Sequence, residues 1–201
     1  MKKKQLLCSL LFTSLALFIP ANTLVAKNVC DTIALKHDSL TVGNPILPGF
    51  HADPEILYSN KTGKYYIYST TDGIPGWGGY KYYVYSSADL KTWKNEGVAL
   101  DASTDQISWA NGNLWAPAAV EVKQKNGSYK YYLYFSARPN DNGRKQMGVA
   151  VSDSPTGPFV DLGKPLLAKN HPGCHGQLID VDVFIDPVSN KPYLYWGNSF
   201  M

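Results

Sequence analysis

Residues 44 to 56 open the first regularly patterned part of the chain, and they read Asn44-Pro45-Ile46-Leu47-Pro48-Gly49-Phe50-His51-Ala52-Asp53-Pro54-Glu55-Ile56. At the end of this stretch an aspartate is followed directly by proline at the start of a predicted strand. Weaker copies of the same end recur downstream at residues 115–117 and 179–181. Pro54, Pro117 and Val181 occupy equivalent places, 63 and then 64 residues apart. The chain therefore contains an internal repeat.

Each repeat has the same order of elements, which is strand, turn, Tyr-rich strand, loop, strand and a closing turn with an aromatic residue. The predicted strands are residues 55–58, 64–70, 80–86, 115–122, 129–136, 146–152, 179–186 and 192–197. Tyr and β-branched residues favour strands, and no helical periodicity is visible after the N-terminal segment. We therefore expect an all-β fold.

Repeats of this size that contain only strands are typical of β-propeller blades. A β-sandwich would also contain many short strands, but the repeated order of elements favours the propeller. A propeller has typically four to eight blades, and this chain encodes roughly two and a half. We expect a partial propeller domain over residues 44–201, truncated at its C-terminus.

The N-terminus has the order of regions found in a secretory signal. Lys2, Lys3 and Lys4 precede an apolar run and a more polar exit that ends at Ala26, so we expect residues 1–26 to direct export and to be cleaved. Residues 27–43 form a polar lead. The chain has 19 basic and 16 acidic residues, and removal of the three lysines leaves 16 of each. The mature protein then lacks the basic excess of nucleic-acid-binding proteins, and we expect no membrane association after cleavage.

Asp53 and Asp180 occupy the same place in the first and third repeats, where the second repeat has Ala116. The first strand of a propeller blade lies beside the central axis, so equivalent strand starts converge on one pocket. Glycoside hydrolases use such a pair of carboxyl groups for catalysis. An Asp beside a Pro is also a common turn former, and the matched pair argues against that alternative.

Several motifs together resemble glycoside hydrolase family 43, which contains arabinanases, β-xylosidases and α-L-arabinofuranosidases. They are residues 50–56, 115–117, 152–159 and 179–186, in that order and at blade spacing. The resemblance implies a five-bladed propeller and an exported hydrolase that cleaves arabinose- or xylose-containing plant polysaccharides with inversion. Asp53 matches the general base of the family. Asp180 matches the residue that orients the general acid and tunes its pKa, although Val181 follows it where the family motif has proline.

The general acid of the family is a Glu on a later blade. None of Glu55, Glu96 and Glu121 matches it, so we expect these 201 residues alone to lack hydrolase activity. A sugar-binding propeller without catalysis and an inactive fragment remain the alternatives.

The substrate-binding candidates are the aromatic residues Phe50 and Trp115 beside the pocket, Trp77 in a Gly-rich loop, and His51. Sugar rings pack on aromatic faces, and a histidine can bond sugar hydroxyls. We expect an oligo- or polysaccharide as partner and no cofactor. The resemblance leaves room for a metal ion at the propeller centre, but the sequence shows no ligand set for one.

Overall fold

A computed structural model describes residues 44–172 and 174–197 of the chain. The expected signal (1–26), the lead (27–43) and Cys30 lie outside these residues. The described part is built from strands, and its one helical element is the 3-10 turn η1 (Pro75–Trp77). The predicted all-β fold is confirmed.

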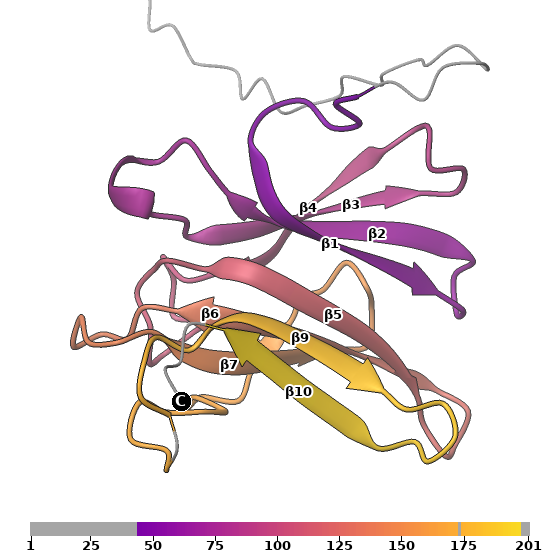
Figure 1. The fold of residues 1–201 in the computed structure, drawn as a ribbon. Coiled ribbons are helices and arrows are strands. Elements are labelled where there is room, and N and C mark those ends of the chain that lie inside the picture. The colour runs from indigo at the N-terminus through magenta and orange to yellow at the C-terminus, as the bar shows by residue number, and fades with distance from the viewer. Residues whose placement is uncertain (1–43, 173, 198–201) are drawn as a thin grey trace, which may run out of the picture.

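The strands form three antiparallel sheets, each corresponding to one sequence repeat (Figure 1). Blade 1 contains β1 (His51–Ser59), β2 (Lys64–Thr71), β3 (Lys81–Ser87) and β4 (Lys94–Asp101). Blade 2 contains β5 (Trp115–Lys123), β6 (Tyr129–Ala137), β7 (Gln146–Ser152) and β8 (Val160–Asp161). Blade 3 is described as β9 (Ile179–Ile185) and β10 (Pro192–Gly197).

The blades pack face to face, as consecutive propeller blades do. Contacts between first strands join β1 to β5 and β5 to β9, and Figure 1 shows these three strands side by side through the stack. Loops that connect β2 to β3, β4 to β5, β6 to β7 and β8 to β9 all lie at the same end as the beginnings of β1, β5 and β9. We call this end the upper face, because it carries both candidate catalytic aspartates.

The fourth strands were not predicted. The segment that forms β4 contains Asn95 and Gly97, which are poor strand formers, and its pairing with β3 is interrupted by two register shifts. β8 has only two residues. Sheet pairing, rather than local propensity, makes these segments extended.

One hydrophobic core spans blades 1 and 2. Buried side chains of blade 1, among them Tyr68 and Tyr82, pack with Leu133 and Phe135 of blade 2. Phe159, the aromatic residue that closes blade 2, is buried and meets Tyr68 edge to face at 6.2 Å between ring centroids. A smaller cluster, which includes Met147, joins blade 2 to blade 3. The aromatic residue that closes blade 2 therefore fills the space between two sheets.

A carboxylate from blade 2 fixes the first turn of blade 1. Glu121 accepts hydrogen bonds from Ser59 Oγ at 2.5 Å and from the backbone N–H of Asn60 at 2.9 Å. The buried hydroxyls of Ser59 and Tyr131 lie 2.8 Å apart. Glu121 lies far from the upper face, at the opposite end of β5, so its role is to join two blades.

Candidate active site

Asp53, Ala116 and Asp180 share one unusual backbone conformation. Their φ angles are 45°, 40° and 56°, in the left-handed region that side-chain-bearing residues seldom adopt. The strand register shifts at each of these places, between Ala52 and Glu55 in β1 and between Trp115 and Ala118 in β5, and residues 180–181 are likewise skipped between β9 and β10. A bulge of this kind turns a side chain out of the ladder. The three sequence repeats were predicted to be equivalent, and in the structure they share the same bulge at the start of each blade.

Thr70 ties Asp53 to the next blade. Its hydroxyl donates to Asp53 Oδ2 at 3.3 Å and accepts from the backbone N–H of Ala116 at 3.0 Å. Tyr82 lies beneath, fully buried, and its hydroxyl donates to the carbonyl of Trp115 at 2.9 Å. Burial, and then the charge of Asp53, raise the pKa of Tyr82 well above its usual value, so this phenol stays a neutral donor. Both contacts hold the bulges of blades 1 and 2 against each other.

Asp180 shares the electrostatic environment of Asp53. Partial burial raises the pKa of Asp180, and the negative charge of Asp53 raises it further. Gly197 on β10 makes room for this carboxylate, because a Cβ there would lie 3.3 Å from Asp180 Oδ2. The two matched aspartates therefore lie in one region of the upper face.

A second pair of acidic residues follows the first, two positions further along the same strands. Glu55 on β1 and Asp182 on β9 correspond to each other as Asp53 and Asp180 do. Burial raises the pKa of Glu55 to about 7, with a hydrogen bond from the backbone of Ala119 opposing the shift and the charge of Asp182 adding to it. Sequence reasoning placed Glu55 only at a strand start. The sequence did contain a signal for this second pair, because an acidic residue stands two positions after the first aspartate in both repeats.

The aromatic candidates gather around the loop between β2 and β3. Trp77 and Phe50 are highly exposed, at 84% and 75% of their surfaces. The carbonyl of Trp77 accepts hydrogen bonds from Trp115 Nε1 at 2.9 Å and from Asn113 Nδ2 at 2.6 Å. The loop of blade 1 that carries Trp77 is thereby fixed to the start of blade 2, next to Ala116.

One face of the Trp115 indole is already occupied. Lys145 Nζ lies 3.6 Å from the ring centroid, which is cation–π distance. Sequence reasoning did not single out Lys145, because it stands in a polar loop ahead of β7 with no motif around it. Lys145 therefore covers one face of the Trp115 ring. Of the three aromatic candidates, Phe50 and Trp77 are the ones whose rings are largely exposed to solvent.

His51 is placed inside blade 1. Its Nδ1 lies 3.0 Å from Ser69 Oγ and its Nε2 lies 2.9 Å from the carbonyl oxygen of Pro48. The ring also packs edge to face on Tyr85, with centroids 5.3 Å apart. Both ring nitrogens of His51 therefore have protein partners, and a substrate hydroxyl would have to displace one of them to bond this ring.

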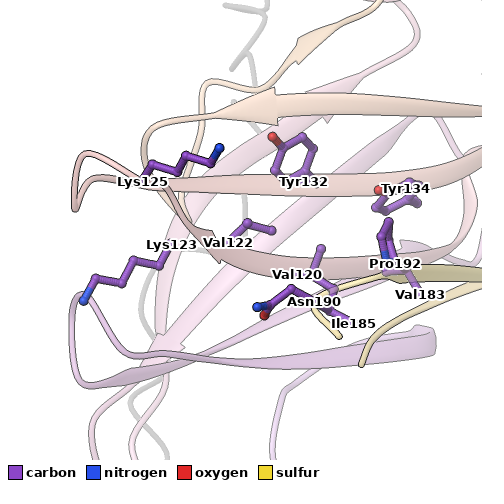
Figure 2. Close-up of a pocket in the computed structure, with 10 residues that line it drawn as sticks. All are labelled: Val120, Val122, Lys123, Lys125, Tyr132, Tyr134, Val183, Ile185, Asn190 and Pro192. Carbon is purple, nitrogen blue, oxygen red and sulfur yellow. The ribbon is translucent and has the colours of Figure 1, made fainter. Parts of the chain in front are cut away.

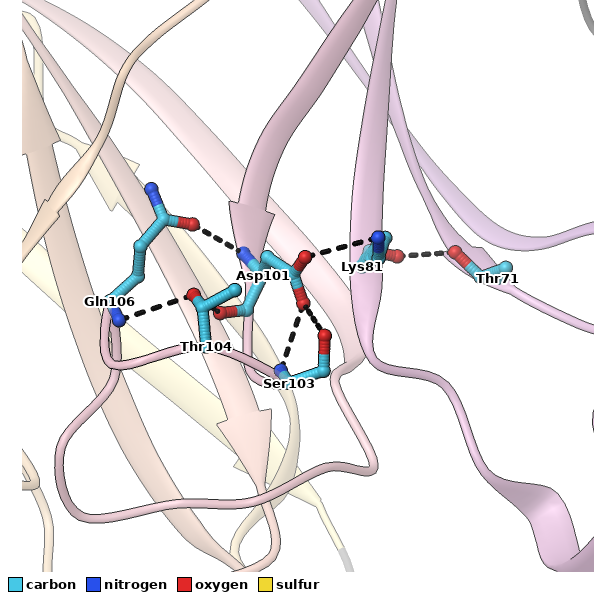
Figure 3. A network of polar contacts seen from close by, with 6 residues as sticks. All are labelled: Thr71, Lys81, Asp101, Ser103, Thr104 and Gln106. Carbon is cyan, nitrogen blue, oxygen red and sulfur yellow. Dashed lines mark hydrogen bonds and ion pairs between the residues drawn. The ribbon is translucent and has the colours of Figure 1, made fainter.

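The loop that leads into Trp115 is anchored by a polar network on the upper face (Figure 3). Asp101, at the end of β4, pairs with Lys81 Nζ at 3.1 Å and accepts from the backbone N–H of Ser103 at 2.8 Å. Gln106 closes the loop by accepting from the backbone N–H of Asp101 at 3.0 Å. Lys81 is thus neutralised within blade 1.

A cavity of the described residues lies elsewhere, between blades 2 and 3 (Figure 2). It measures about 550 Å³. It is lined by Val120, Val122, Lys123, Lys125, Tyr132, Tyr134, Val183, Ile185, Asn190 and Pro192. No carboxylate lines it, and its β5 residues come from the second half of that strand rather than from its start, so it is not the candidate active site.

Among residues 44–172 and 174–197, no group of three or more His, Cys, Asp or Glu side chains is arranged to hold a metal ion. Within the same ranges no helix has the length and apolar character needed to cross a membrane. Cys174 is buried as a free thiol.

Comparison with known proteins identifies relatives over most of the chain. The family model for glycosyl hydrolases family 43 matches residues 42–200. An arabinoxylan arabinofuranohydrolase from Bacillus subtilis is 34% identical over 173 residues, which cover 73% of this chain and 31% of that protein.

Two solved structures are similar in both sequence and fold. One is a β-xylosidase/α-arabinofuranosidase from a compost microbial metagenome in complex with xylotriose, with TM-score 0.61 and 35% identity, over 76% of this chain and 44% of the other. The other is an endo-arabinase from Bacteroides thetaiotaomicron, with TM-score 0.58 and 31% identity, over 73% of this chain and 44% of the other. The chain spans less than half the length of each relative.

Proposed function

The chain belongs to glycosyl hydrolases family 43, and from this membership we propose that the whole protein is a glycoside hydrolase acting on arabinose- or xylose-containing plant polysaccharides. The observation that carries the proposal is the pair of bulges that present Asp53 and Asp180 to one region of the upper face. The relatives named above act, by their names, on arabinoxylan, on xylosides and on arabinan-type substrates.

In the proposed mechanism Asp53 is the general base. It removes a proton from a water molecule, whose oxygen attacks the anomeric carbon from the face opposite the leaving group. The glycosidic C–O bond breaks, and the leaving oxygen takes a proton from an acid. This single displacement inverts the anomeric centre. It requires the carboxyl groups of base and acid to lie roughly 6.5–9.5 Å apart, so that the water fits between the base and the sugar. No cofactor is required, because carboxyl groups supply both proton transfers.

Asp180 acts on the acid rather than on the substrate. A negative charge close to a second carboxyl group raises the pKa of that group and keeps it protonated, which a proton donor needs. The resemblance assigns the donor to a Glu on a later blade. The three glutamates of this chain have other surroundings, since Glu96 accepts from Ser86 at 2.7 Å, Glu121 joins two blades and Glu55 is packed between first strands.

The test replaces Asp53 by Asn in the whole protein. This change keeps the shape and the Thr70 contact but removes the base, and general-base catalysis contributes about 10²–10⁴-fold in rate. We expect kcat on arabinoxylan or xylotriose to fall by about that factor, with substrate binding retained. Asp72→Asn, in the exposed loop before Trp77, is the matched control. Unchanged turnover by Asp53→Asn would remove Asp53 from the mechanism, and a wild type that binds xylotriose without hydrolysis would favour a sugar-binding propeller.

We further propose that residues 1–26 direct export and are removed. The mature chain would then begin at Lys27. Intact-mass measurement of protein recovered outside the cytoplasm tests this, and a mass that includes Met1 to Ala26 would contradict cleavage.

A further inference from the structure

Lys145 lies at the junction of blades 2 and 3 on the upper face. Its side chain covers Trp115, the neighbour of Ala116, with Nζ 3.6 Å from the ring centroid. Its backbone N–H donates to Gln177 Oε1 at 2.7 Å, and its carbonyl accepts from the backbone N–H of Leu178 at 3.2 Å. Lys145 is therefore fixed between the bulge of blade 2 and the segment that leads into Asp180.

Arg138, at the other end of the same loop, is the nearby second cation. Its Nε donates to Asn111 Oδ1 at 3.0 Å and its backbone N–H donates to the carbonyl of Gly112 at 2.8 Å. Burial lowers the pKa of Lys145, and the positive charge of Arg138 lowers it further. The two half-buried cations thus stand at the two ends of one loop and influence each other electrostatically.

Neither cation forms an ion pair with a carboxylate in the described part of the chain. Other basic side chains around the upper face have partners. Lys81 pairs with Asp101, and Lys169 pairs with Asp141. A partly desolvated pair of like charges without a counter-charge is unfavourable, and a bound anion removes that penalty.

We propose that Arg138 and Lys145 form a subsite for the carboxylate of an acidic sugar, a uronic acid carried by the polysaccharide. This inference rests on the proposed function, because an anion held beside Trp115 on the upper face would belong to the same glycan that reaches Asp53 and Asp180. The guanidinium group offers paired N–H donors that match a carboxylate. The ammonium group supplies a point charge and is held in place by the indole, so little side-chain entropy is lost on binding.

The experiment is calorimetric titration of the whole protein with two probes, xylotriose and a xylotriose that carries one glucuronic acid. At low salt we expect the acidic probe to bind about tenfold more tightly than the neutral one. The preference should shrink severalfold at about 0.5 M salt, because screening weakens contacts between partly exposed charges. Lys145→Met and Arg138→Gln should each remove most of the preference, and Arg138→Gln, which leaves the contact of Lys145 with Trp115 in place, should leave affinity for xylotriose within about twofold.

Lys123→Met is the matched control. Lys123 also stands over an aromatic ring, that of Tyr129 at 6.0 Å, but at the opposite end of β5. Its loss should leave the preference intact.

Equal affinity of the wild type for both trisaccharides would overturn the acidic subsite and leave the proposed function standing. Absence of binding by either probe would count against both. If inorganic sulfate displaced the acidic probe at equal concentration, the two cations would bind anions in general, and the assignment to an acidic sugar would be wrong. The salt dependence is measured on the wild type, so the inference stays testable even if a variant fails to fold.

Discussion

At the scale of single residues, the site depends on side chains whose surroundings change their chemistry. Asp180 is affected by burial and by Asp53, and Glu55 by burial and by Asp182. Sequence reasoning singled out Asp53 and Asp180 as candidates because both stand at the start of a repeat. It did not single out Glu55 or Lys145, because their environments come from neighbouring blades and not from adjacent residues.

Glu55 makes the stability of the protein depend on pH. Its pKa is raised from 4.5 to about 7 in the folded state, so folding favours the protonated form. The stability gained is fully present below pH 4.5 and is lost as the pH rises through about 7. Glu55→Gln mimics the protonated form, and we expect it to unfold with a free energy about 1–2 kcal/mol higher than the wild type at pH 8. Urea denaturation from pH 5 to 8 measures this.

Glu96→Gln is the contrasting control. Burial works against the ionised form of Glu96, but hydrogen bonds from Lys94 and Ser86 lower its pKa overall. Its contribution is therefore present at neutral pH and is lost as the pH falls, opposite in sign to Glu55. Identical pH profiles for the wild type and Glu55→Gln would contradict the assignment.

At the scale of the elements, Tyr-rich strands and their turns were predicted correctly, because alternation and turn residues are local signals. The fourth strands were missed. Asn95 and Gly97 are poor strand formers, so the β4 segment does not look like a strand in the sequence, and β8 contains only two residues. The bulges at the start of each blade were not predicted as such. The sequence showed the repeat, but only the pairing register shows that residues 53, 116 and 180 leave the ladder.

The bulge of blade 2 predicts a stabilising substitution. Ala116 has φ of 40°, which costs an alanine about 1 kcal/mol or more relative to glycine. We expect Ala116→Gly to raise the free energy of unfolding by about 0.5–1 kcal/mol after allowance for the greater freedom of glycine in the unfolded chain. Thermal and urea unfolding test this. Ala118→Gly, two residues later and buried in the regular ladder, should destabilise instead, and equal effects at the two positions would argue against strain.

At the scale of the whole molecule, blades 1 and 2 share one core, and Glu121 and Thr70 add polar links between them. We expect the two blades to unfold as one unit. Leu133→Ala, in the core of blade 2, should lower the free energy of unfolding by about 2–5 kcal/mol. Amide hydrogen exchange should show the same loss at Tyr68 in blade 1 as at Phe135 in blade 2.

Lys125→Ala, in the exposed turn between β5 and β6, is the control for this effect and should leave exchange in both blades unchanged. If Leu133→Ala accelerated exchange in blade 2 alone, each blade would be an independent folding unit.

The bulge at Ala116 also matters for protein design. Blade 2 keeps the backbone turn that aims an acidic side chain in blades 1 and 3, yet holds only a methyl group there. Asp53 and Asp180 demonstrate that aspartate accepts this conformation. The backbone at position 116 is therefore already suited to an acidic side chain. The single substitution Ala116→Asp would add a third carboxylate beside the existing two without a change of the backbone.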